Sequence, residues 1–250
     1  MKIDLITRAQ LEVINKRNLR YPLTDAEKDY FLAVILKIIY NSFLADSLVF
    51  KGGTAIHHCY LEQLRFSNDL DFTTIKSINL VKLKRIFDEH EFINLKKLNE
   101  KKYSLNFYLQ YKGILRQPNS VNININTNQK VLLKPNWSSY DNYYNVDVKV
   151  NSMNIKEIAA EKIRTLNERI RGRDLYDLYL IKSKFKLNLK EAIEILRRKE
   201  LFKPFSKESL KENMHLALEA YDSEIKNLYL KQFVSKENLN SLIREIIKEI

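Results

Sequence analysis

Apolar and polar residues follow two different periods along this chain, and the change between them divides it in two. Short apolar runs and stretches of alternating apolar and polar residues stand between helical segments in the first part, a pattern typical of a mixed sheet flanked by helices. From Asn154 to Ile250 the apolar residues recur with a helical period, interrupted near Gly172 and at Pro204. We therefore predict an α+β chain with a mixed domain at 1–152, which includes N-terminal helices, and an all-helical domain at 153–250.

The first domain is expected to contain both helices and strands. Helices are predicted over 7–19, 22–43, 54–64 and 78–90, and strands over 47–53, 69–74, 91–98, 103–112, 120–127 and 143–149. Thr24 and Glu27 have the spacing of a capping box, which predicts the start of the second helix. Val121, Ile123 and Ile125 alternate with polar residues, as expected of a strand that buries one face.

Two of the four glycines, Gly52 and Gly53, stand side by side where a predicted strand passes into a predicted helix. A turn of this kind presents free backbone N–H groups, and the missing Cβ lets an anion approach closely. The pair therefore indicates a phosphate site, although a tight turn that needs unusual backbone angles accounts for it as well. The surrounding residues contain neither the Walker pattern nor the dinucleotide fingerprint.

A second candidate lies in the stretch RFSNDLDF at 65–72. If the extended conformation reaches back far enough, Arg65, Ser67, Asp69 and Asp71 share one face of a strand. Two carboxylates at this spacing can both reach a divalent cation. The alternative is a solvated strand face, but aspartate is depleted in strands, so a pair at this spacing needs a specific cause.

Composition adds a preference for polyanionic partners. The chain has 43 basic and 31 acidic residues, a formal net charge of +12, which favours nucleic acid as a partner. A Lys-rich composition inherited from the genome accounts for the charge equally well. With one cysteine, Cys59, no internal disulfide can form, and no apolar stretch is long enough to span a bilayer, so we expect a cytoplasmic protein without membrane contact.

The glycine turn, the following helix and the Asp-x-Asp strand are more specific together than apart. The sequence motif KGGTAI…RFSNDLDF resembles the AbiEii/AbiGii-type nucleotidyltransferase toxins, as does the stretch EIAAEKIRTLNERIRGRDLYDLYLI at 157–181. The resemblance covers about 45–181 and implies the nucleotidyltransferase fold of the DNA polymerase beta-like superfamily. It also implies roles for single residues: triphosphate binding for Gly52, Gly53 and Thr54, a hydroxyl contact for Ser67, Mg²⁺ or Mn²⁺ binding for Asp69 and Asp71, neutralisation of phosphate charge for Lys162, and the late acidic position for Asp174, with Asp177 on the same helix face.

The same resemblance implies an activity and partners. The expected enzyme transfers a nucleoside monophosphate from an NTP to an RNA acceptor, for which tRNA is the leading candidate, within a toxin–antitoxin or abortive-infection system that includes a cognate antitoxin. Two alternatives remain: a nucleotidyltransferase for small molecules such as antibiotics, and an inactive module that binds RNA or nucleotide. Transfer to a protein acceptor also stays open.

One departure from the family pattern concerns a third acidic residue on a neighbouring strand. The expected strand at 120–127 offers Asn122, Asn124 and Asn126 instead, and an asparagine cannot accept a proton. Asp174 is the favoured replacement. Alternatively, the strand that carries Asp147 is the relevant neighbour, or activity is lost. Pairing of the aspartates with Arg65, Arg171 or Arg173 in a structural ion network is a further alternative.

Overall fold

The computed structural model describes residues 3–199, 203–226 and 228–250, which divide into two compact units. The first unit holds residues up to Glu62, Phe66–Asn128 and Asn136–Ser152. The second holds Gln63–Arg65, Gln129–Pro135 and Met153–Ile250. Two short segments from within the mixed part of the sequence therefore belong to the helical unit.

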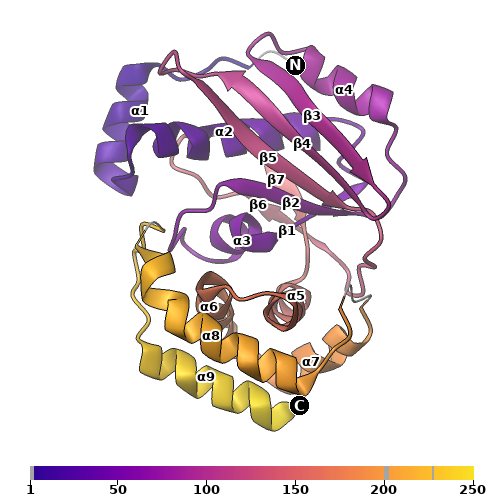
Figure 1. Cartoon of the computed structure of the whole chain (residues 1–250). Coiled ribbons are helices and arrows are strands. Elements are labelled where there is room, and N and C mark those ends of the chain that lie inside the picture. Colours follow the sequence, from indigo (N-terminus) through magenta and orange to yellow (C-terminus); the bar gives the residue numbers. More distant parts are fainter. Residues whose placement is uncertain (1–2, 200–202, 227) are drawn as a thin grey trace. The chain divides into compact units, whose positions relative to one another are not determined.

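Seven strands in the described part of the first unit form one mixed sheet, in the order β3-β4-β5-β2-β1-β7-β6. The strands are β1 (Leu48–Lys51), β2 (Asp69–Thr74), β3 (Ile93–Lys101), β4 (Ser104–Lys112), β5 (Pro118–Asn126), β6 (Asn136–Ser139) and β7 (Lys149–Ser152). The pairs β2–β5 and β1–β7 are parallel, and the others are antiparallel. Strand β5 thus lies directly beside β2, although β3 and β4 come between them in the sequence, and β3 forms one edge of the sheet (Figure 1).

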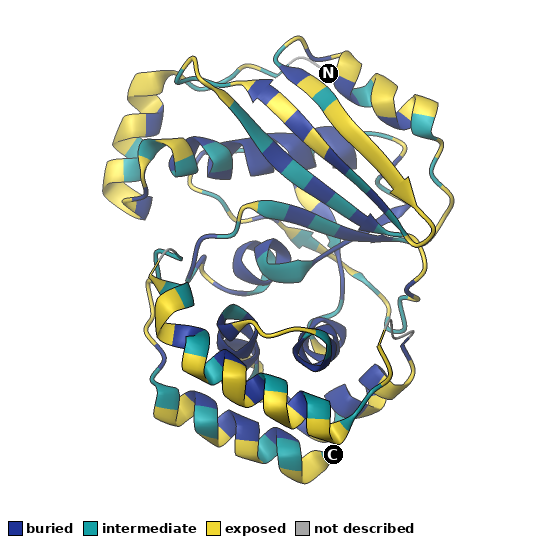
Figure 2. Ribbon diagram, viewed as in Figure 1, coloured by how far each residue is buried: buried dark blue, intermediate teal, exposed yellow. Residues whose placement is uncertain are grey.

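Helices of the first unit precede the sheet or connect its strands. They are α1 (Arg8–Ile14) with the π-helical segment η1 (Asn15–Leu19), α2 (Leu23–Tyr40), α3 (Gly52–Ala55) with the π-helical segment η2 (Ile56–Tyr60), and α4 (Leu80–Asp88). Helix α2 is buried on nearly every side, and its Phe31 stacks on Tyr111 of β4 with ring centroids 3.8 Å apart. Phe87 of α4 lies beside Phe107 of β4. One face of the sheet is therefore the core face, covered by α2 and α4 (Figures 1 and 2).

The second unit contains α5 (Ile155–Glu168), α6 (Gly172–Phe185), α7 (Leu189–Arg197), α8 (Lys207–Ile225) and α9 (Lys236–Glu249). Helix α5 contacts α6, α7 and α8, and α9 packs on α8, α6 and α7. The described residues include no helix both long and apolar enough to cross a membrane. The predicted fold class, a mixed sheet flanked by helices and followed by helices alone, is confirmed.

Two local predictions are wrong. The strand predicted over 143–149 is mostly a loop, because the side chain of Asn142 bonds to the backbone of Tyr140, Tyr144 and Val146 and closes a compact turn. The short strands on either side of that loop, β6 and β7, pair with each other instead.

The capping box predicted for α2 is also absent. Pro22 precedes the helix, and no side chain caps its first turn. Glu27 instead accepts a hydrogen bond from the backbone N–H of Leu115, 2.7 Å away. Burial raises the pKa of Glu27, while backbone hydrogen bonds oppose that increase. A long-range contact has therefore taken the side chain that the local pattern assigned to the cap.

Candidate active site

The predicted glycine turn lies between β1 and α3, and its geometry requires glycine for two reasons. Gly52 has φ +79°, in the left-handed region that favours glycine. A Cβ atom built on Gly52 would lie 2.5 Å from Oδ2 of Asp71. The backbone of the turn therefore lies directly against one of the two predicted metal-binding carboxylates.

Thr54, in α3, forms hydrogen bonds with Asp69, the first residue of β2, and with Ser67, which lies just before that strand. Its Oγ1 donates to the carbonyl oxygen of Asp69 at 2.6 Å and lies 2.8 Å from Oγ of Ser67. Thr54 is buried, whereas Ser67 is partly exposed. The Thr54 hydroxyl is thus engaged within the protein, which leaves its backbone N–H as the group by which it would contact phosphate.

Asp69 and Asp71 lie on one face of β2 because side chains alternate along a strand. Leu70 and Phe72 are fully buried on the opposite face, and both aspartates are partly exposed. The strand begins at Asp69, so the extended face predicted to reach back to Arg65 does not form. The structure brings together six predicted residues of the first unit: Gly52, Gly53, Thr54, Ser67, Asp69 and Asp71.

The asparagine strand lies directly beside the aspartates. In the parallel pair β2–β5, Asp69 is opposite Asn122 and Asp71 is opposite Asn124. Asn124 donates a hydrogen bond from Nδ2 to Oδ1 of Asp71 at 3.0 Å, and Asn122 donates to Oδ1 of Asn124 at 3.3 Å. The position expected for a third carboxylate is therefore occupied by an amide, which carries no charge and holds Asp71 in place.

Asp147 does not fill that position. It is exposed and lies in the loop before β7, a strand that pairs with β1 and β6 and not with β2. The alternative that its strand is the relevant neighbour is therefore wrong.

Lys51 is a residue of this site that the sequence analysis missed. It is the last residue of β1 and lies opposite Asp71 in the antiparallel register, so both side chains project from the same face of the sheet. Lys51 is buried, with 8% of its surface exposed. Its place directly before the two glycines was the only signal in the sequence, and one lysine among many carries little weight.

The two aspartates suit Mg²⁺ or Mn²⁺, which bind oxygen ligands and are commonly held by one or two carboxylates plus substrate phosphates. No group of three or more His, Cys, Asp or Glu residues in the described part of the chain could hold a metal ion. A cation at Asp69 and Asp71 would therefore need ligands from a bound triphosphate and water, as such sites commonly do.

The remaining predicted residues belong to the second unit and form a buried ion cluster. Lys162 Nζ lies 2.7 Å from Oδ1 of Asp174 and 2.6 Å from Oδ2 of Asp177. Arg65 holds both oxygens of Asp177 in a bidentate pair at 2.7 Å. Arg169 contacts Oδ2 of Asp174 at 3.1 Å. Three cations thus surround two carboxylates.

These neighbouring charges determine the pKa of Asp174. Burial raises its pKa, but the charges of Lys162 and Arg169 outweigh burial and hold the pKa below its usual value. A carboxylate of lowered pKa is a weak proton acceptor. Arg65 pairs with Asp177, as one of the alternatives predicted, whereas Asp174 pairs with Arg169, an arginine for which no pairing was predicted. The role of Asp174 as a base stays a prediction, and its contacts favour positioning of Lys162.

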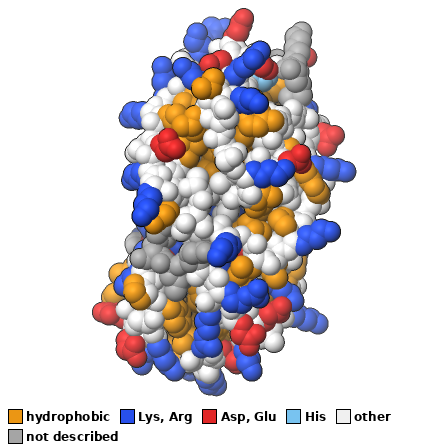
Figure 3. All heavy atoms as spheres, turned by 90° about the vertical axis from the view of Figure 1, so that its right-hand side faces the viewer, with side chains coloured by type: hydrophobic (Ala, Val, Ile, Leu, Met, Phe, Trp, Pro, Cys, Tyr) orange, Lys and Arg blue, Asp and Glu red, His pale blue; other side chains and the backbone are white. Residues whose placement is uncertain are grey.

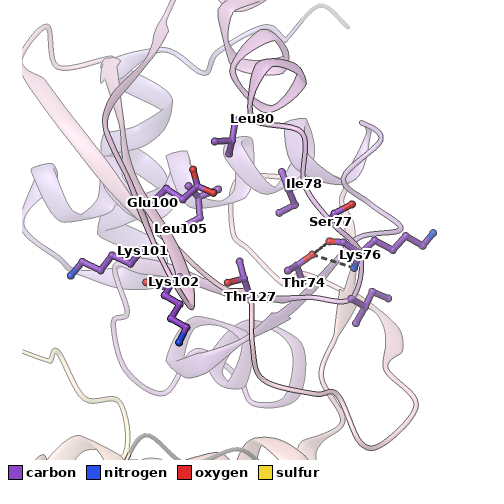
Figure 4. A pocket seen from close by; sticks show the side chains of 12 residues that line it. Thr74, Lys76, Ser77, Ile78, Leu80, Glu100, Lys101, Lys102, Leu105 and Thr127 are labelled. Carbon is purple, nitrogen blue, oxygen red and sulfur yellow. Dashed lines mark hydrogen bonds between the residues drawn. The ribbon is translucent and has the colours of Figure 1, made fainter.

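A hollow lies at the far end of β2, beyond the aspartates. It has a volume of about 510 Å³ and lies among Thr74, the β3–β4 turn and Thr127. The side chains of Lys76 and Lys101 point away from its centre, and Ile78 and Leu105 line it (Figure 4). Lys102 also lines the hollow, but so does the carboxylate of Glu100, so the hollow does not have the character of a triphosphate site.

Comparison with known proteins points to one family. Residues 34–246 match the family model described as nucleotidyl transferase AbiEii toxin, type IV toxin–antitoxin system. A search of curated proteins gives no match.

Two solved structures have a similar fold. MenT4, a nucleotidyltransferase toxin from Mycobacterium tuberculosis H37Rv, is 15% identical with a TM-score of 0.61, over 96% of this chain and 88% of that chain. JHP933 from Helicobacter pylori is 19% identical with a TM-score of 0.60, over 92% and 94% of the two chains. At these identities the likeness concerns the fold.

Proposed function

Because this chain belongs to the AbiEii family of nucleotidyltransferase toxins, we propose that it transfers a nucleoside monophosphate from an NTP to the end of an RNA acceptor, with tRNA as the leading candidate. The observation that carries the proposal is the contact between the Gly52 turn and Asp71, with Asp69 on the same strand face. A phosphate bound by the turn would lie beside both carboxylates, which are the oxygen ligands that would hold a divalent cation.

The reaction exchanges one phosphorus–oxygen bond for another. The acceptor hydroxyl oxygen bonds to the α-phosphorus, the bond from that phosphorus to the bridging oxygen breaks, pyrophosphate leaves, and the hydroxyl proton passes to water. Mg²⁺ or Mn²⁺, when bound, offsets charge on the phosphates and makes the acceptor hydroxyl more acidic. Asp69 and Asp71 would hold that cation, and Asn124 orients Asp71 by its hydrogen bond.

The other candidate residues bind or orient phosphate. The backbone N–H groups of Gly53 and Thr54 and the hydroxyl of Ser67 would contact the triphosphate. Lys162 remains the candidate for stabilising the negative charge of pyrophosphate as it leaves. Asp174 and Asp177 fix its ammonium group at 2.7 and 2.6 Å, which limits the freedom of a long side chain.

Charge supports RNA as the acceptor. The net charge of +12 attracts a polyanion, and basic side chains are spread over the face shown in Figure 3. An acceptor pocket for cationic antibiotics would be expected to carry negative charge instead. Membership of a type IV toxin–antitoxin family also implies an antitoxin partner.

A second candidate function rests on the asparagines. With Asn122 and Asn124 in place of a third carboxylate, the fold could bind RNA and nucleotide without transfer. RNA retention by the parent protein without any label transfer would favour this alternative.

The proposal is tested by incubating the purified protein with Mg²⁺, total RNA and each NTP radiolabelled at the α-phosphate. We expect label in RNA with at least one NTP, and a loss of at least 100-fold, about 2.7 kcal/mol, in Asp71→Asn. Asp147→Asn, at an exposed aspartate in a loop of the same unit, is the matched control and should keep the parental rate. Parental transfer by Asp71→Asn would overturn the site, and label confined to protein would overturn the RNA acceptor.

A further inference from the structure

The face of the sheet that carries Asp69 and Asp71 continues across three more strands. Residues directly opposite each other on neighbouring strands project from the same face. One such row runs Asp69, Asn122, Tyr108 and Lys96, on β2, β5, β4 and β3. The next row runs Asp71, Asn124, Asn106 and Asn99. The predicted metal ligands and the outermost strand are therefore joined by an unbroken polar surface.

This surface is accessible on β3 and β4. Tyr108 is a large side chain with 42% of its surface exposed, although its neighbours Phe107 and Leu109 are buried on the core face. Figure 2 shows exposed and half-buried positions recurring along β3, β4 and β5. Strands lie about 4.8 Å apart, so Tyr108 is about 10 Å from Asp69 across the sheet.

An irregularity in β3 brings two successive lysines to this aromatic ring. The register between β3 and β4 shifts between Lys96 and Asn99, and Lys97 has φ +50°. In a regular strand two successive side chains would point to opposite faces. Here Lys96 lies opposite Tyr108, and Nζ of Lys97 lies 6.0 Å from the centre of the Tyr108 ring.

The two lysines and Tyr108 line a hollow of about 550 Å³, together with Gln110, Pro118, Asn119 and Ser120. Among the described residues that line it, none carries a carboxylate. Exposed aromatic rings with nearby cations are the usual equipment for binding single-stranded nucleic acid, because bases stack on the ring and phosphates pair with the cations.

We propose that this surface, defined by Lys96, Lys97, Tyr108 and Gln110, binds the single-stranded end of the RNA acceptor and guides it along the row toward Asp69. The inference rests on the proposed function and names where the acceptor binds. One base stacks on Tyr108, and Lys96 and Lys97 contact phosphates, while Gln110 and Asn122 offer hydrogen bonds that suit more than one base.

A protein partner that extends the sheet at β3 is the competing occupant, and the edge itself disfavours it. Lysines and a bulge on an edge strand are features that prevent pairing with another strand. Three consecutive positions at the irregularity, 96–98, are exposed, and two of them are lysine. The observed surface is thus better suited to a polyanion than to a strand.

The test measures binding of a short fluorescent single-stranded RNA by anisotropy, with Mg²⁺ and without NTP. We expect Tyr108→Ala to weaken binding about five-fold or more, because stacking of one base is lost. Tyr108→Phe keeps the ring and should stay within about two-fold of the parent protein.

The lysines are tested through salt dependence. In Lys96→Gln/Lys97→Gln the slope of log affinity against log salt should fall in magnitude by about 1.4, since each contact to a single strand contributes about 0.7. Lys82→Gln/Lys84→Gln removes the same charge from exposed positions of α4, which covers the core face, and should leave the slope nearly unchanged. Parental affinity and slope in both the Tyr108→Ala and the Lys96/Lys97 variants would overturn the proposal, as would absence of RNA binding by the parent.

A parallel transfer assay separates this proposal from the proposed function. Label transfer to RNA by the parent, with an unchanged RNA KM in Tyr108→Ala, would overturn the acceptor surface and leave the enzyme activity standing. RNA binding that depends on Tyr108, with no transfer of label from any NTP, would support the acceptor surface and overturn the proposed nucleotidyltransferase activity. Loss of antitoxin binding in these variants, with RNA affinity unchanged, would assign the surface to a protein partner and overturn the proposal.

Discussion

The carboxylate of Asp71 occupies the space that a side chain at residue 52 would need: its Oδ2 lies 2.5 Å from the position of a Cβ atom on Gly52. The two residues are 19 positions apart in sequence and meet because β1 and β2 are antiparallel neighbours, with Lys51 opposite Asp71. The glycine turn and the Asp-x-Asp strand, recognised as separate motifs, therefore form one site.

Gly52→Ala should abolish most nucleotide transfer. The substitution combines a positive φ with a contact at 2.5 Å, so either the turn or Asp71 must move. We expect the free energy of unfolding to fall by about 1–3 kcal/mol, measured by urea denaturation, and transfer to fall more steeply than this loss of folded protein would cause. Gly53→Ala, at the next position and without a positive φ, is the matched control for stability. Parental transfer by Gly52→Ala would contradict the assignment of the turn.

Thr54→Val removes the hydroxyl of Thr54 while nearly preserving the shape of the side chain, and it should lower the stability of the protein. Valine is similar in size but leaves the carbonyl of Asp69 without its 2.6 Å donor. We expect a loss of about 1–3 kcal/mol in the free energy of unfolding, because the freed carbonyl is poorly solvated. Thr54→Ser keeps the hydroxyl and should lose less. A loss in Thr54→Ser together with parental stability in Thr54→Val would show that the methyl group, and not the hydrogen bond, matters.

Asn124→Asp restores an acidic residue beside Asp71 and removes the donor to Oδ1. Two adjacent carboxylates repel each other unless a cation lies between them. We expect the variant to be less stable than the parent by about 1–2 kcal/mol in a chelator, and to recover when Mg²⁺ is added. Asn126→Asp, on the same strand but opposite Thr73, should show no such recovery. A response to Mg²⁺ equal to that of the parent would argue against a cation at Asp71.

Asp174 should contribute to stability in a pH-dependent way. Its pKa is held below the usual value in the folded state, so its contribution is present above the unfolded value of about 3.9 and is lost as pH falls through the folded value. Asp174→Asn is therefore expected to flatten the decline of unfolding free energy below about pH 4, measured by denaturation across that range. Asp147→Asn, at an exposed position, serves as the control. An unchanged decline in Asp174→Asn would contradict the ionic cluster as the cause.

Lys162→Met should be strongly destabilising. It leaves Asp174 and Asp177 buried with one cationic partner fewer each, and breaking a buried pair on one side costs about 3–5 kcal/mol. The double variant Lys162→Met/Asp177→Asn should lose less than the sum of the two single variants, because the second change removes the uncompensated charge. Additive losses would show that the two residues do not interact.

The sequence by itself determined the features that depend on neighbours along the chain. Alternation at Val121, Ile123 and Ile125 predicted the buried face of β5, and the amphipathic spacing after Asn154 predicted the helical half, because periodicity reports which side of an element is buried. The glycine pair and the Asp-x-Asp pair were likewise visible, since each is a local motif with a physical purpose.

Tertiary structure alone decided which of these local features meet. That Asn124, rather than Asp147, lies beside Asp71 follows from the parallel pairing of β2 with β5, whose partners are distant in sequence. The capping role predicted for Glu27 was lost to Leu115 in the same way, and Arg65 joined the ion cluster of Asp177 instead of extending the face of β2. Strand order and the pairing of buried charges depend on the packing of the whole chain, so no local pattern could specify them.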